Sequence, residues 1–206
     1  MIVGRNIQVI LSAVWFFANQ PALAAHPAAE QEASTAFRDI CATGPLAPAA
    51  VFGRAAAHGW RKTGDKFPKD FDPSTQRISP DRKSPLLLSA SSETSNGERR
   101  DICAIAIGSP VRGLESTLET WLGFRPYFAM GRSATFIAIR SGDSWRSGNE
   151  LGQSGFEKAK SRGEFYTIIV GDRGKPQSNE GYSAEIVLMR VQPMGSLSGN
   201  GKRIRP

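Results

Sequence analysis

Residues 86–107 read LLLSASSETSNGERRDICAIAI, a pattern typical of a β-hairpin. Asn96-Gly97 is a preferred pair for a tight turn between antiparallel strands, so strands are predicted at 86–90 and 99–107. Both faces of the second strand are apolar, with Cys103, Ile105 and Ile107 on one and Ile102, Ala104 and Ala106 on the other. A strand with two apolar faces is expected at the centre of a sheet.

Three further segments are rich in β-forming residues and are expected to be strands: 134–140, 164–170 and 182–191. Three segments have the spacing of amphipathic helices: from about Glu30 to Cys41, from Pro48 to His58, and from Ser109-Pro110 to Gly123. Residues 61–84 are polar and are expected to be a long loop with one short strand at most. A short helix fits Phe156 to Lys160.

The expected fold class is α+β, with two layers. An antiparallel sheet of about five strands carries the N-terminal helix pair and one central amphipathic helix. Residues 25–194 are expected to form this one domain, and residues 195–206 a disordered basic tail.

The first 24 residues have the features of a secretory signal peptide. Arg5 precedes a largely apolar run from Ile7 to Ala18, and Ala22-Leu23-Ala24 provides the small residues that signal peptidase recognises. The run is shorter than the roughly 20 apolar residues of a membrane-spanning helix. We expect cleavage after Ala24 or Ala25, a periplasmic or secreted location, and no transmembrane segment in the mature form.

The chain is basic, with 26 Lys and Arg residues against 19 Asp and Glu residues. These basic residues are spread over separate segments and form no recognition motif, so nucleic-acid binding is not expected. Weak affinity for an anionic envelope polymer is compatible with such a surface.

Cys41 and Cys103 are the only two cysteines. An even pair in an exported protein predicts a disulfide. In the predicted elements, Cys41 lies on the apolar face of a helix and Cys103 on an apolar face of the central strand, so the bridge would attach the helix to the sheet. Two free thiols, or a metal-binding or catalytic cysteine, are the alternatives.

Few residues form a catalytic pattern. His58 is the one histidine inside the expected domain apart from His26 near its start, and the end of a helix already explains its position. Glu115 and Glu119 are spaced as a pair of carboxylates on one helix. They lie next to the apolar stripe, where side chains ordinarily face solvent. No cofactor and no metal site is predicted.

Two weaker patterns concern ions. Asp70 and Asp72 form only a fragment of a calcium loop, within a segment that also contains Asp65 and Asp81. Gly108-Ser109-Pro110 precedes a predicted helix, whose first turn could hold an anion, although a plain helix cap is the simpler interpretation.

Phe37-x3-Cys41, then Gly59-Trp60, then Cys103 in a strand resembles a loose group of small exported proteins of Gram-negative bacteria. The resemblance covers residues 33 to 107 on few positions. It implies export and the cysteine pair, and it transfers no activity and no site residue to this chain.

We therefore expect an exported, non-enzymatic binding module whose partner is an unknown protein or an anionic envelope polymer. The alternative is a small hydrolase that acts on envelope material and uses His58 or a carboxylate pair. A pocket that gathers such groups would favour the hydrolase.

Overall fold

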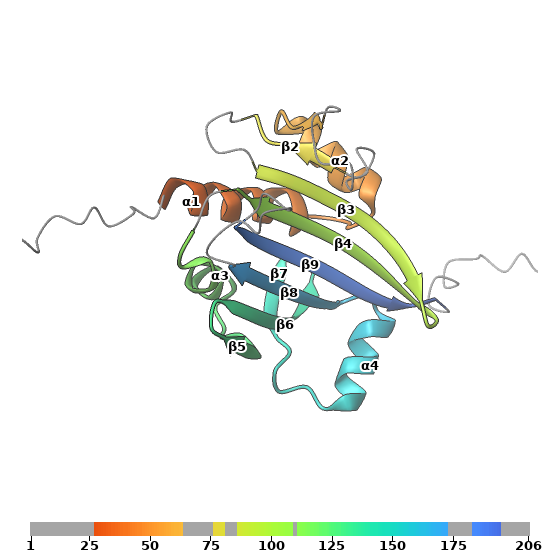
Figure 1. Ribbon diagram of the computed structural model, residues 1–206. Coiled ribbons are helices and arrows are strands. Elements are labelled where there is room, and N and C mark those ends of the chain that lie inside the picture. The colour runs from red at the N-terminus through yellow and green to blue at the C-terminus, as the bar shows by residue number, and fades with distance from the viewer. Residues whose placement is uncertain (1–26, 64–75, 81–85, 109–110, 173–182, 195–206) are drawn as a thin grey trace, which may run out of the picture.

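The computed structural model describes residues 27–63, 76–80, 86–108, 111–172 and 183–194. Within these ranges the chain is α+β, and its helices pack on one antiparallel sheet (Figure 1). Several sequence expectations lie outside the described residues: the signal peptide at 1–24, the tail at 195–206, the four aspartates Asp65, Asp70, Asp72 and Asp81, and Ser109-Pro110.

In the part of the chain that the structure describes, the sheet has nine strands: β1 (Arg61–Lys62), β2 (Gln76–Ile78), β3 (Leu86–Ser95), β4 (Glu98–Ile107), β5 (Phe128–Met130), β6 (Ser133–Ser141), β7 (Ser144–Ser147), β8 (Phe165–Asp172) and β9 (Ala184–Pro193). Their order is β1-β2-β3-β4-β9-β8-β6-β5, and β7 pairs with another part of β6. Asn96 and Gly97 have φ of 53° and 73° and form the predicted turn between β3 and β4. The predicted central position of β4 is confirmed, because it lies between β3 and β9.

The expected strand count of about five was too low. All five predicted strands are present as β3, β4, β6, β8 and β9, and the four additional strands contain only two to four residues each. Segments this short cannot display the alternation by which a strand is recognised. They are strands because they pair with their neighbours in the sheet.

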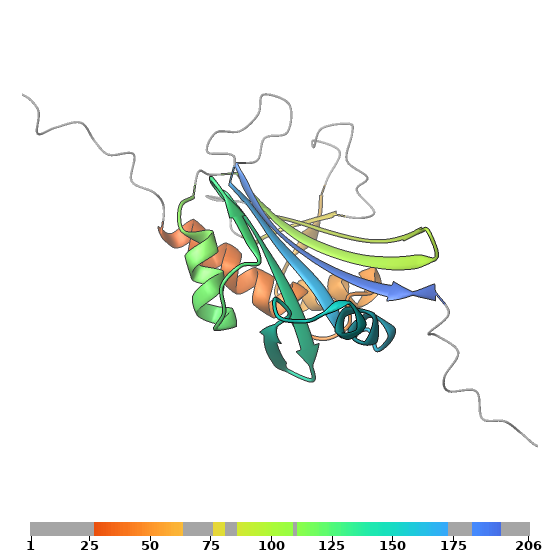
Figure 2. The same cartoon turned by 90° about the horizontal axis from the view of Figure 1, so that it is seen from below.

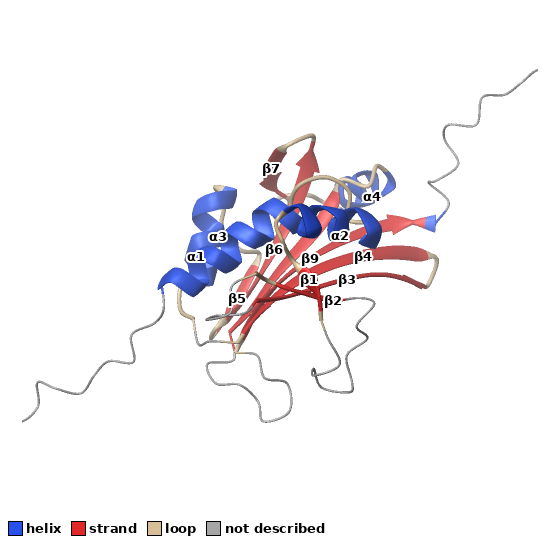
Figure 3. Ribbon diagram, turned by 90° about the horizontal axis from the view of Figure 1, so that it is seen from above, coloured by secondary structure: helices blue, strands red, loops and turns tan. Residues whose placement is uncertain are grey.

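The described ranges also contain four helices and one π-helical turn: α1 (Pro27–Ala36), η1 (Phe37–Cys41), α2 (Pro48–Ala57), α3 (Leu114–Leu122) and α4 (Gln153–Ser161). Figure 3 shows α1 and α2 running across the strands, and Figure 2 shows α1 and α3 side by side. The predicted apolar face of the first helix is confirmed, because Ala33, Phe37, Ile40 and Cys41 are at most 1% exposed.

The main core lies between these helices and one face of the sheet. Alternate residues of the central strands face the helices and are buried: Cys103, Ile105 and Ile107 on β4, Ile186 and Leu188 on β9, and Ile168 and Val170 on β8. The Cα atoms of Cys41 and Cys103 are 5.6 Å apart, and their sulfur atoms are at disulfide distance, as the sequence predicted.

The two-layer arrangement was wrong in detail, because α4 packs on the opposite face of the sheet. Ala159 of α4 is buried in a small cluster with Phe165 and Val191, whose side chains alternate with those of the main core. The Gly- and Lys-rich sequence of α4 concealed this contact, since one alanine and one phenylalanine provide most of its apolar surface.

The third predicted helix begins later than expected, at Leu114. Gly113 has φ of +93°, a left-handed conformation that an α-helix cannot contain and that glycine adopts without strain. Val111 is nevertheless buried, as the apolar stripe predicted, but it lies before the helix. Within the described residues, no helix has both the length and the apolar character required to cross a membrane.

Candidate functional site

A pocket of about 460 Å³ lies where α1 and η1 meet the end of α2 and the start of β3. We call it the α1 pocket. Its apolar lining is Ala36, Ile40, Trp60, Pro80 and Leu86. Its polar lining is Gln31, Glu32, Thr35, Asp39, His58 and Ser79. The volume is within the range of pockets that bind small ligands or single large side chains.

The floor of the α1 pocket belongs to the core. Ile40, Trp60 and Leu86 are 1%, 7% and 3% exposed, so the floor is fixed by packing on its inner side. The backbone N–H of Trp60 donates to the Ala55 carbonyl at 3.0 Å, which folds the chain back after α2, and the Trp60 side chain packs in the core. Packing in the core therefore holds the floor of the pocket in place.

One polar ridge of α1 and η1 forms the rim. Glu32, Thr35 and Asp39 follow each other at helical spacing and are exposed, and Gln31 Nε2 donates to Thr35 Oγ1 at 3.4 Å. The π-turn of η1 is marked by the Ala42 N–H, which donates to the Phe37 carbonyl at 2.9 Å. This wider turn carries Asp39 and Ile40 to the pocket and Cys41 to the sheet.

His58 ends α2, as predicted, and its side chain is exposed at the pocket. Gly59 follows with φ of +78°, the left-handed residue expected at this helix end. A Cβ on Gly59 would lie 3.9 Å from Pro80, so the end of α2 touches another wall of the pocket. In the described part of the chain, the His58 imidazole has no hydrogen-bond or ion-pair partner.

Ser79 is the serine in the pocket lining, and its hydroxyl has a structural partner. Ser79 Oγ accepts the Leu86 N–H at 3.0 Å, and the Ser79 N–H donates to the Leu86 carbonyl at 3.0 Å. Nucleophilic catalysis requires a hydroxyl bonded to a base that a third group orients. Among the described residues, Ser79 is bonded to the Leu86 backbone rather than to a base, and no third group orients His58.

The predicted carboxylate pair lies elsewhere. Glu115 and Glu119 on α3 line a second hollow of about 490 Å³ together with Arg112 and Arg132. Glu119 Oε1 is 3.6 Å from Arg125 Nε. Glu119 thus has a basic partner, and His58 does not line this hollow.

The start of α3, where the sequence suggested an anion, receives a carboxylate from the protein itself. Thr117 Oγ1 donates to Glu30 Oε1 of α1, and a Cβ on Gly113 would lie 3.2 Å from the same oxygen. A carboxylate at a helix N-terminus interacts favourably with the free N–H groups and the helix dipole. Glu30 therefore links α1 to α3.

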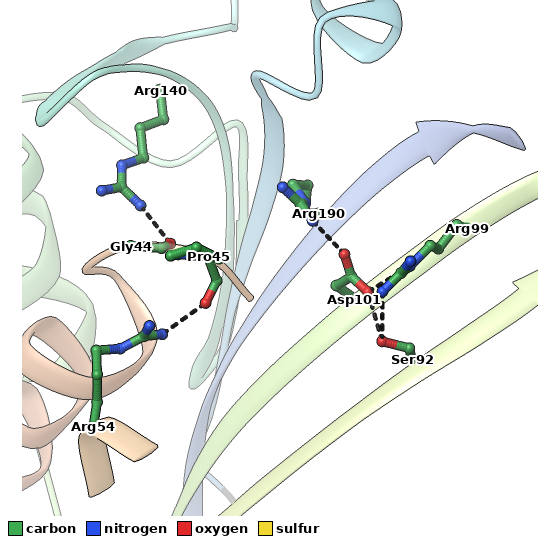
Figure 4. Close-up of polar contacts among 8 residues, drawn as sticks. All are labelled: Gly44, Pro45, Arg54, Ser92, Arg99, Asp101, Arg140 and Arg190. Carbon is green, nitrogen blue, oxygen red and sulfur yellow. Dashed lines mark hydrogen bonds and ion pairs between the residues drawn. The ribbon is translucent and has the colours of Figure 1, made fainter. Parts of the chain in front are cut away.

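Two arginines hold the segment between η1 and α2 (Figure 4). Arg54 donates to the Ile40 carbonyl at 2.8 Å and to the Pro45 carbonyl at 2.9 Å, and Arg140 donates to the Gly44 carbonyl at 3.2 Å. Burial, and then the charge of Arg140, lower the pKa of Arg54 from its ordinary value. These bonds satisfy carbonyls at the end of η1, so both guanidinium groups have structural roles.

Asp101 on β4 is the centre of a second polar cluster (Figure 4). It is 1% exposed and accepts hydrogen bonds from Ser92 at 2.6 Å, Arg99 at 2.9 Å and Arg190 at 2.5 Å. Burial alone would raise the pKa of Asp101, but the hydrogen bonds from Arg190, Ser92 and Arg99 outweigh burial and lower it. The cluster joins β3, β4 and β9 and is fully paired at the carboxylate.

No family model, curated protein or solved structure matches this chain. Within the described residues, no group of three or more His, Cys, Asp or Glu side chains could hold a metal ion. Gln31, Glu32, Thr35 and Asp39 are the rim residues that sequence reasoning missed. Their helical spacing opposite Ala33 and Phe37 was visible, but such a ridge ordinarily indicates only a solvated helix face.

Proposed function

We propose that this protein is an exported, non-enzymatic binding module and that the α1 pocket holds part of a partner protein. The observation that supports this most directly is the pocket's composition: a fixed apolar floor beneath a rim with Glu32 and Asp39. An apolar floor binds an apolar side chain, and two carboxylates attract a cation beside it. The partner would thus present a large apolar residue next to a basic one.

The rim charge separates the two partner classes expected from the sequence. Glu32 and Asp39 would repel an anionic envelope polymer at this position, even though the chain as a whole is basic. A protein segment with a basic residue is the partner that this charge favours.

In-cell photo-cross-linking tests the proposal. A benzophenone amino acid replaces Thr35 at the rim, and a matched control carries it at Glu157, which is exposed on α4 across the sheet. We expect one dominant partner from position 35 that is absent from position 157 and is lost when Glu32→Lys and Asp39→Lys are added. The same products from both positions, or products indifferent to the charge reversal, would contradict the proposal.

Export has its own test. The apolar run at 7–18 and the cysteines at disulfide distance support it. N-terminal sequencing of protein recovered from the periplasm or the medium should give a start at Ala25 or His26. A start at Met1 in that pool would contradict cleavage.

The second candidate function is hydrolysis, and one observation favours it: His58 lies in the same pocket as Glu32 and Asp39. A histidine and a carboxylate could together activate water. Purified protein should then hydrolyse a member of a panel of esters, peptides and glycans, and His58→Ala should abolish that activity. Activity that survives His58→Ala would contradict His58 as the base, and no activity on the panel would contradict hydrolysis of these substrate classes.

A further inference from the structure

β5 forms the edge of the sheet opposite to β1, far from the α1 pocket in strand order. It pairs with β6 on one side, through Phe128↔Thr135, Ala129↔Ala134 and Met130↔Ser133. The apolar side chains here are unusually exposed to solvent: Tyr127, Phe128 and Met130 are 60%, 55% and 70% exposed. Most large apolar side chains in the described residues are buried, so this edge is an exception.

One residue of β5 has backbone hydrogen-bonding groups that do not face β6. Gly131 and Arg132 form a two-residue turn between the paired residues Met130 and Ser133. In such a hairpin the residues that flank the turn exchange hydrogen bonds, and the next residue points its N–H and C=O outward. Ala129 therefore directs a donor and an acceptor away from β6, as a template for another strand.

The side chains of β5 add an apolar strip to this edge. Phe128 and Met130 share one face of the sheet because they alternate with Ala129. Ile169, which is 36% exposed, lies on the same face, since Thr135 pairs with both Phe128 and Ile169. An added strand with apolar residues at alternate positions would cover this strip.

Charge limits the choice of occupant. Arg125 precedes β5 and Arg132 follows it, and the side chain of Arg125 is 89% exposed despite its ion pair with Glu119. Two copies paired antiparallel about Ala129 would bring Arg132 of one copy towards Arg125 of the other. Like charges across a strand pair are destabilising, whereas acidic residues at both ends of an incoming strand would be attracted.

We propose that the β5 edge accepts an extended peptide segment of another protein, with apolar residues at alternate positions and acidic residues at its ends. The main-chain groups of Ala129 would bind the backbone, Phe128, Met130 and Ile169 the apolar side chains, and Arg125 and Arg132 the acidic ends. Strand addition of this kind takes affinity from main-chain bonds and specificity from alternate side chains. The surface is separate from the α1 pocket, so the proposal stands independently of the proposed function.

Fluorescence anisotropy tests the proposal with chain 25–206 and a labelled peptide that has valines at alternate positions and aspartates at both ends. We expect binding that weakens about tenfold or more in Ala129→Pro, which removes the outward N–H without breaking a bond to β6. Ala129→Ser is the matched control and should stay within about twofold of the unmodified chain. Equal binding to the Pro variant would overturn the proposal.

If Ala129→Pro lowers the melting temperature, a second test reverses the charges of the two arginines and leaves β5 unchanged. The double variant Arg125→Glu, Arg132→Glu should prefer a peptide with lysines in place of the aspartates. Sedimentation of the unmodified chain without peptide measures whether two copies form a dimer. A preference that does not switch, no binding of the aspartate peptide, or a dimer that Ala129→Pro dissociates would each overturn the proposal, the last in favour of a second copy.

Discussion

Cys41 at the end of η1 and Cys103 in the middle of β4 have Cα atoms 5.6 Å apart, although 62 positions separate them in sequence. The first lies in the helical layer and the second in the central strand, and both are fully buried. Because η1 also carries Asp39 and Ile40, this link holds one wall of the α1 pocket against the sheet.

Replacing Cys103 by Ser should lower the free energy of unfolding by roughly 2–5 kcal/mol, since the bond closes a long loop in the unfolded chain. Cys41→Ser should cost a similar amount, and the double variant should be no less stable than either single variant, because each already breaks the same bond. Thermal melts measure the effect. Two reactive thiols per chain in unreduced, denatured protein from the periplasm would contradict the bridge.

Asp101→Asn should change the pH dependence of stability. The hydrogen bonds lower the pKa of Asp101 in the folded state, so its contribution is complete above the unfolded value of about 3.9 and is lost as pH falls through the folded-state pKa. We expect a loss of about 3 kcal/mol at neutral pH that shrinks at lower pH. Urea unfolding at pH 7 and pH 3 measures both.

The matched control for Asp101 is Asp143→Asn, because the side chain of Asp143 is fully exposed 3.6 Å from Arg140. This control should leave stability nearly unchanged at both pH values. A loss in Asp101→Asn that is equal at pH 7 and pH 3 would show that the carboxylate charge does not cause the effect.

Substitutions of two glutamates on α1 should affect different properties: stability for Glu30 and partner binding for Glu32. Glu30→Ala removes the acceptor of the Thr117 hydroxyl and the negative charge at the start of α3, and should cost about 1–2 kcal/mol. Glu32→Ala removes an exposed rim residue and should leave stability within about 0.5 kcal/mol while reducing partner binding. Thermal melts and cross-linking yield separate these effects. Equal melting temperatures for both variants would contradict the role assigned to Glu30.

The long periodic segments of this fold could be predicted from the sequence, and the short ones could not. β4 was recognised because six consecutive apolar residues follow Asp101, and α2 because Pro48 and Gly59 mark its ends. β5 and β7 are held by pairing with β6, a long-range interaction that leaves no local pattern. The helix predicted from Ser109-Pro110 to Gly123 includes Gly113, whose left-handed conformation moves the start of α3 to Leu114.

The candidate site was predictable only in part. His58 was identified at the end of α2, and it does line the α1 pocket. The rest of the pocket comes from segments far apart in sequence, such as Asp39 in η1, Ser79 after β2 and Leu86 in β3. Their proximity depends on the sheet order and on the π-turn, and neither can be inferred from residue spacing.

Titration of nitrogen-15-labelled chain 25–206 with tryptamine and with indole-3-acetate tests the α1 pocket most directly, since the two probes share an indole ring and carry opposite charges. The structure predicts that tryptamine shifts the amide signals of Thr35 and Asp39 and the indole signal of Trp60, with weaker shifts from the acetate. Glu32→Lys with Asp39→Lys should reverse that preference. Equal shifts from both probes, or shifts confined to residues outside the pocket, would contradict a site for an apolar group beside a cation.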